Sequence, residues 1–129
     1  MKPRESMLRL KRFEADEKAR KVADIEAMIR EFEGMAADLE RQIESEEERT
    51  GIRDIGHFAY STFAKAAAQR RENLVTSVDD LRAKLAVAVG EREAAMESLR
   101  KFEEGDGRAS TSPRSSRRRV ANGSGALAS

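Results

Sequence analysis

The feature that most constrains this chain is a narrow apolar stripe along residues 22–43. Apolar side chains recur there in alternating steps of three and four residues, at Val22, Ile25, Ile29, Phe32, Ala36, Leu39 and Ile43. This heptad spacing is typical of the seam of a left-handed coiled coil. The intervening residues are mostly charged, so the helix has only one apolar side. It therefore needs a partner helix.

A second stripe in the same chain can supply this partner. If the chain folds back near Arg53, the two stripes meet in one register, with Ile29 opposite Val78 and Ile43 opposite Phe63. The steps from Phe63 to Leu74 span eleven residues, which predicts a local hendecad. We predict a seam made of Val22, Ile25, Ile29, Phe32, Leu39, Ile43, Leu74, Val78, Leu81 and Leu85.

The pattern predicts an all-α fold, a long antiparallel two-helix coiled-coil hairpin over residues 1–104. The first helix is expected at about residues 5–49, the turn at about 50–56 and the second helix at about 57–104. Gly51 can adopt the left-handed conformation that follows a helix, and Asp54 and Ser61 are candidate N-caps. Glutamates crowd residues 44–48, where the helix dipole disfavours anions, so we expect fraying there.

The composition changes sharply after Glu104. Residues 105–129 are rich in Gly, Ser and Arg and carry too few apolar residues to fold, so we predict a disordered tail. Its arginines favour a solubilising role over nucleic-acid binding, because no aromatic residues or known module accompany them. These arginines are Arg108, Arg114, Arg117, Arg118 and Arg119.

Composition also bounds the class of protein. Charged residues make up 38% of the chain and aromatic residues 5%, which indicates long helices rather than a thick core. The absence of cysteine is consistent with a reducing compartment, and no uncharged run approaches the ~20 residues of a membrane span. There is no phosphate-binding loop, and His57 is the only histidine. We therefore expect no metal, cofactor, small-molecule substrate or enzymatic activity.

Two regions are candidate contact surfaces. Residues 1–13 carry cations at Lys2, Arg4, Arg9, Lys11 and Arg12 against one acid, Glu5, and include Leu10 and Phe13, which lie off the seam. The turn region crowds together apolar residues at Ile52, Ile55, Phe58, Tyr60 and Phe63. The first region is either a solvated helix face or a contact surface, and the second is either a self-packed cap or a partner site.

Four stretches resemble the flagellar export protein FliJ family in its alphaproteobacterial form. They are LRLKRF at residues 8–13, KARKVADIEAMI at 18–29, HFAY at 57–60 and FAKAAAQRR at 63–71. The likeness covers about residues 4–103, and the stretches at the turn are its most specific part. Family members commonly continue as charged helix beyond this point, whereas this chain changes to Gly, Ser and Arg.

The resemblance implies a cytoplasmic, non-enzymatic stalk component of the bacterial flagellar type III protein export apparatus. Such proteins are similar to the central stalk of rotary ATPases and lie at the cytoplasmic face of the inner membrane, at the flagellar base. They serve protein transport and flagellum biogenesis, and hence chemotaxis. The implied partners are the hexameric export ATPase ring, the export gate and export chaperones, with membrane contact only indirect.

Carried onto this chain, the resemblance assigns the ATPase contact to the basic N-terminal segment. The residues are Arg4, Arg9, Lys11 and Arg12. It assigns the export-gate contact to the turn, at Phe58, Tyr60 and Phe63. The chain is expected to be a monomer on its own. The alternatives are a generic coiled-coil scaffold that dimerises through its seam, and a nucleic-acid binder that uses the arginine tail.

Overall fold

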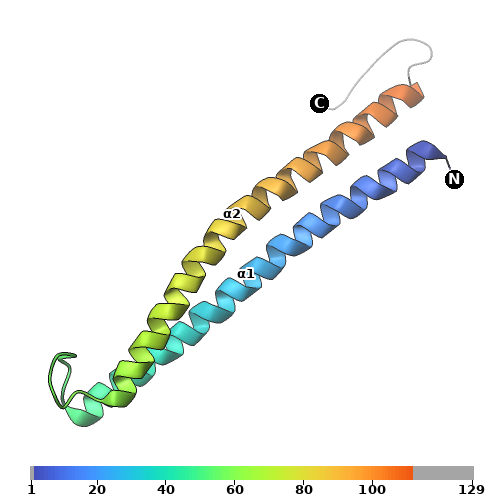
Figure 1. Ribbon diagram of the computed structural model, residues 1–129. Helices are drawn as coiled ribbons and strands as arrows, with labels where there is room; N and C mark the ends of the chain where they lie inside the picture. Colours follow the sequence, from blue (N-terminus) through green and yellow to red (C-terminus); the bar gives the residue numbers. More distant parts are fainter. Residues whose placement is uncertain (1, 112–129) are drawn as a thin grey trace. The chain divides into compact units, whose positions relative to one another are not determined.

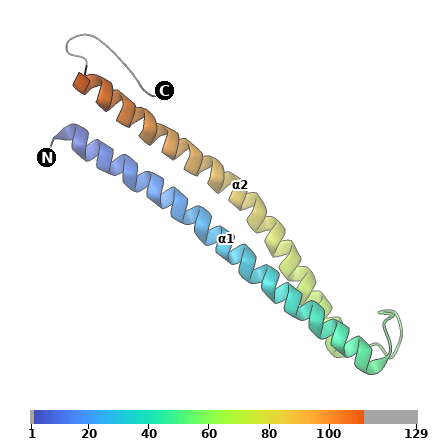
Figure 2. The same cartoon turned by 180° about the vertical axis from the view of Figure 1, so that it is seen from behind.

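The fold is a helical hairpin, as the apolar periodicity predicts. A computed structural model describes residues 2–111, and these form two helices, α1 (Pro3–Thr50) and α2 (Thr62–Thr111), joined by residues 51–61. The chain packs as two compact units. The turn unit is Ala19–Gly90, and the terminal unit is the described part of Met1–Lys18 and Glu91–Ser129. Within each unit, a length of α1 lies beside a length of α2 that runs in the opposite direction (Figures 1 and 2).

Local chemistry explains where α1 begins and ends. Pro3 occupies the first helical position, where its missing N–H costs nothing, and the Lys2 N–H donates to Glu5 Oε1 at 3.2 Å. Gly51 directly follows Thr50, the last residue of α1. It has a φ of +76°, and its N–H donates to the Glu47 carbonyl at 2.8 Å. The prediction for Gly51 is confirmed, because a residue without Cβ adopts this left-handed conformation at little cost.

The seam of the turn unit consists of two apolar clusters. The first contains Val22, Ile25, Ile29, Val78, Leu81 and Ala88, with Phe32, Leu85 and Val89 half-buried against it. The second contains Leu39, Ile43, Tyr60, Ala64 and Ala67, with Ile52, Ala68 and Leu74 half-buried against it. The ten residues named above for the predicted seam all lie in one of the two clusters, whereas Phe63, expected opposite Ile43, does not. Burying this stripe removes apolar surface from water, and that is the main force that pairs the helices.

The seam takes a different path from the predicted one at the start of α2. Phe63, expected opposite Ile43, is 55% exposed, whereas its neighbour Ala64 is completely buried. The buried positions therefore run through Tyr60, Ala64 and Ala67, and the steps of four and three residues keep the heptad. The predicted hendecad is wrong because the side chain of Tyr60 and the small Ala64 fill the space that Phe63 was expected to fill.

The second helix begins later than the sequence predicted, at Thr62 instead of about residue 57. Ser61 is its N-cap, because the Ser61 Oγ accepts the Ala64 N–H at 3.1 Å and the Ser61 carbonyl accepts the Lys65 N–H at 3.0 Å. The other candidate, Asp54, instead accepts the Gly56 N–H at 3.0 Å and forms a tight turn. The predicted turn at residues 50–56 is thus a longer loop, residues 51–61.

The helix α2 also ends later than predicted, at Thr111 rather than near Glu104. Glycine lowers helix stability by about 1 kcal/mol but does not forbid the conformation, so Gly105 and Gly107 are accommodated. The rest of the predicted tail, residues 112–129, lies outside the described residues. Neither helix, over its described length, contains a stretch apolar enough to cross a lipid bilayer.

Candidate functional site

The loop of residues 51–61 is held by its own hydrogen bonds. The His57 N–H donates to the Asp54 carbonyl at 3.0 Å, and the Tyr60 N–H donates to the His57 carbonyl at 3.0 Å. The His57 ring also takes part, because its Nδ1 accepts the Ala59 N–H at 2.9 Å. These bonds form consecutive turns and reduce the conformations open to the loop. The side chains of the loop are therefore presented in a defined arrangement.

Tyr60 anchors this loop to the turn unit. Only 8% of the residue is exposed, and its hydroxyl donates to Glu47 Oε2 on α1 at 2.6 Å. The hydrogen bond to Glu47 and, next, burial raise the pKa of the Tyr60 phenol. The resemblance assigned Tyr60 to a partner contact, but in this structure its ring packs in the second seam cluster. Tyr60 thus holds the loop to α1 and is left with little exposed surface of its own.

Phe58 is the side chain that the loop presents to solvent. It is 96% exposed and stacks on the His57 ring, with ring centroids 4.7 Å apart. Phe63 and Ile55 are each more than half exposed nearby in the chain. Fully exposed phenylalanines are uncommon in folded proteins because of the apolar surface that they leave in water. Of the three predicted turn contacts, Phe58 and Phe63 are thus accessible and Tyr60 is not.

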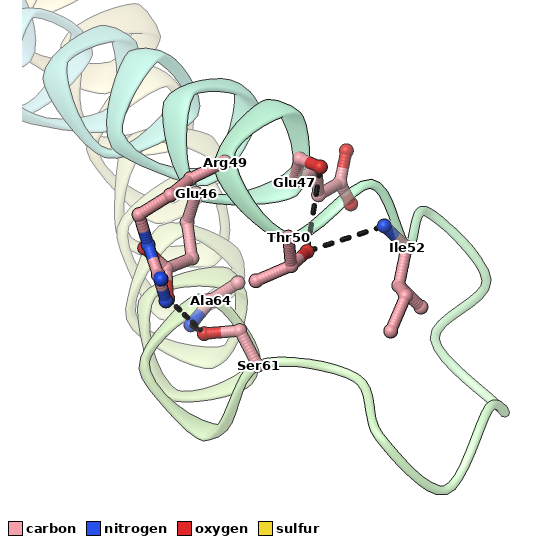
Figure 3. A network of polar contacts seen from close by, with 7 residues as sticks. All are labelled: Glu46, Glu47, Arg49, Thr50, Ile52, Ser61 and Ala64. Atoms are coloured by element: carbon pink, nitrogen blue, oxygen red, sulfur yellow. Dashed lines mark hydrogen bonds and ion pairs between the residues drawn. The ribbon is translucent and has the colours of Figure 1, made fainter.

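A polar network joins the last turns of α1 to the start of α2 (Figure 3). Glu46 Oε2 accepts the Ser61 hydroxyl at 2.7 Å, while the Arg49 guanidinium donates to Glu46 at 2.7 and 3.0 Å. The hydrogen bonds from Arg49 and then Ser61 lower the pKa of Glu46 to about 2. The Thr50 hydroxyl accepts the Ile52 N–H at 3.2 Å and donates to the Glu47 carbonyl.

This role of the glutamates was not predicted from the sequence. Fraying was expected because anions are unfavourable at a helix C-terminus, yet α1 remains helical to Thr50. The expectation is wrong because Glu46 and Glu47 each accept hydrogen bonds from donors across the turn, including Ser61 and Tyr60. A usable signal was present, since the hydroxyl residues Tyr60 and Ser61 lie across the loop from the acidic end of the first helix.

The terminal unit uses most of the predicted basic contact residues internally. The Arg4 guanidinium lies 5.3 Å from the centre of the Phe102 ring, in a cation–π contact with α2. Lys11 is half-buried, and its Nζ donates to Ser98 Oγ at 3.0 Å. Arg12 forms an ion pair with Glu103 at 3.6 Å. Arg9, the fourth residue of the predicted set, is exposed on α1.

The seam of the terminal unit is partly polar. The heptad continues N-terminally from Val22, but Lys11 and Lys18 occupy seam positions on either side of the buried Ala15. Lys18 pairs with Glu91 at 3.5 Å, which keeps its charge partly compensated. Such exposed pairs contribute little, typically about 0–1 kcal/mol, so this seam is held less tightly than an apolar one.

Within the described residues, no group of three or more His, Asp or Glu side chains is arranged to hold a metal ion. Phe63 lines a surface hollow of about 440 Å³ together with Asp38, Gln42 and Ser45 among others. The surfaces that stand out are therefore the turn around Phe58 and the outer side of α1 around Arg9. Each presents exposed side chains, Phe58 at the turn and Arg9 on α1.

Comparison with known proteins adds no assignment, since no family model, curated protein or solved structure matches this chain.

Proposed function

We propose that this chain is a non-enzymatic stalk component of the bacterial flagellar type III protein export apparatus. In this role it lies at the cytoplasmic face of the inner membrane, at the flagellar base. It contacts the export ATPase ring through the N-terminal part of α1 and the export gate through the turn. Export chaperones are a further class of partner. The likeness of residues 8–13, 18–29, 57–60 and 63–71 to the FliJ family motivates the proposal.

The observation that carries the proposal is the presentation of Phe58. The motif HFAY, the most family-like part of the chain, forms a hydrogen-bonded loop with Tyr60 buried beneath it and Phe58 96% exposed. A rigid aromatic anchor of this kind suits protein recognition, because little conformational entropy is lost on binding. Pairing of the two helices does not by itself explain why Phe58 is exposed, whereas a role in binding another protein does.

The internal pairing of the seam also favours a stalk over a dimerising scaffold. The apolar stripes of α1 and α2 bury each other in the turn unit, with Val22 only 2% exposed. A second chain could use this seam only if the hairpin opened and lost that burial. We therefore expect the isolated chain to be a monomer, and sedimentation velocity measures this directly. A dimer at micromolar concentration would favour the scaffold alternative.

The direct test measures binding to the two proposed partners separately. The purified chain is expected to stimulate ATP hydrolysis by the export ATPase and to bind the cytoplasmic part of the export gate. Phe58→Ala should weaken gate binding by at least about tenfold, the loss typical of an aromatic anchor, and leave ATPase stimulation unchanged. Val75→Ala, a change at another exposed apolar residue of α2, is the matched control. Absence of binding to both partners would refute the proposal.

A further inference from the structure

The outer side of α1 in the terminal unit carries large apolar side chains that the pairing with α2 leaves uncovered. They are Met7, Leu10 and Phe13, and Leu10 and Phe13 are 48% and 59% exposed. Their spacing of three residues places them along one side of the helix. Phe13 lies two residues from both Lys11 and Ala15 of the seam, which is about 200° around the helix from each. It therefore faces away from α2.

The cations of this segment divide into two groups by their contacts. Arg4, Lys11 and Arg12 contact Phe102, Ser98 and Glu103 of α2, respectively. The exposed Lys2 and Arg9 do not belong to this set. Lys2 immediately precedes α1, and Arg9 lies on α1 one turn before Phe13, on the same side of the helix. The outer apolar side chains thus have positive charge beside them.

The charge pattern limits the length of this surface. Residues 2–13 include the single acid Glu5, whereas Glu14, Asp16 and Glu17 follow immediately after Phe13. The positive part of α1 therefore ends at the same place as the exposed apolar residues. An apolar patch bordered by cations is complementary to an apolar groove bordered by carboxylates. A second copy of this chain is a poor occupant, because it would bring the Arg9 side chains together.

We propose that the outer face of α1, formed by Met7, Leu10 and Phe13 with Lys2 and Arg9, docks into an acidic, apolar groove of a partner protein. This inference rests on the proposed function, in which the partner is the export ATPase. It moves the contact from the cations that reach α2, which are Arg4, Lys11 and Arg12, to the side of the helix that carries Phe13 and Arg9. The apolar side chains supply most of the affinity, and the two cations mainly speed association.

The test compares variants of the full chain in binding to the purified export ATPase. The double variant Leu10→Ala/Phe13→Ala should bind at least about tenfold more weakly, with unchanged helicity and thermal unfolding. Its matched control is Met28→Ala/Met35→Ala, two exposed apolar residues of the same helix, which should bind as wild type. Phe13→Gln is a second variant that keeps a long, helix-compatible side chain and should also weaken binding.

Charge variants separate the exposed cation beside Phe13 from a cation that pairs with α2. Arg9→Glu should slow association and reduce its salt dependence, whereas Arg12→Gln should change affinity by about twofold or less. Equal binding by wild type and both Phe13 variants would overturn this inference and leave the proposed function intact. Absence of wild-type binding to the ATPase would also overturn this inference, and the proposed function would then depend on binding to the export gate. Self-association of wild type that Leu10→Ala/Phe13→Ala abolishes would identify a second copy as the occupant and also overturn the inference.

Discussion

The position of Phe63 gives the sharpest test of how the two helices pair. Periodicity placed Phe63 in the seam, whereas the structure leaves it 55% exposed and buries Ala64 completely. The two arrangements predict opposite effects for two substitutions one residue apart. Phe63→Ala probes the first arrangement and Ala64→Leu the second. Ala66→Leu, at an exposed position of the same turn of α2, is the matched control for the added side chain.

The magnitudes follow from burial. A fully buried phenylalanine costs about 3–5 kcal/mol when truncated to alanine, but a side chain half in solvent loses only about 1 kcal/mol of transfer free energy. Adding a leucine side chain at Ala64 overfills a packed site and should cost about 1–3 kcal/mol. Alanine and leucine differ little in helix propensity, so Ala66→Leu should change stability by less than about 0.5 kcal/mol.

Urea unfolding followed by circular dichroism measures these differences. If the slope of unfolding free energy against urea is unchanged, the shift in midpoint gives the change in stability. We expect Ala64→Leu to be clearly less stable than Ala66→Leu, and Phe63→Ala to lose only about 1 kcal/mol. A loss of about 3 kcal/mol or more for Phe63→Ala, together with an unaffected Ala64→Leu variant, would refute the seam through Ala64.

Two further predictions concern the polar groups beneath the loop. The pKa of Glu46 is lowered from 4.5 to about 2, so its stabilising effect is complete above about pH 4.5 and is lost as the pH falls toward 2. Glu46→Gln should therefore reduce the acid sensitivity of the urea midpoint in this range, and an unchanged pH dependence would contradict the network. Glu47 raises the pKa of Tyr60, the only tyrosine, so Glu47→Ala should move the alkaline titration of tyrosine absorbance to lower pH. An unchanged titration would show that the hydroxyl is not bound to Glu47.

The central seam could be predicted from sequence because periodicity encodes which side of a helix is apolar. From Val22 to Ile43 the spacing of apolar residues is compatible with only one side of the helix facing its partner, and that side is the one buried in the structure. At residues 63 and 64 two adjacent apolar residues compete for the same side, and periodicity favours the larger one. Packing selects Ala64 instead, since Tyr60 and Ala67 fill the remaining space beside it. Which of the two residues is buried therefore depends on how side-chain volumes fit in the folded structure, and the spacing of apolar residues does not encode this.

The contact surfaces show a different limit of sequence reasoning. Spacing correctly placed Leu10 and Phe13 off the seam, because the angular position of a residue follows from its number. It could not tell which cations remain available, because arginine and lysine side chains are long enough to reach around a helix toward its neighbour. Arg12 reaches Glu103 and Lys11 reaches Ser98, while Arg9 is exposed one turn before Phe13. Net charge therefore locates a basic segment, but the contacts of each side chain determine which part of it can meet a partner.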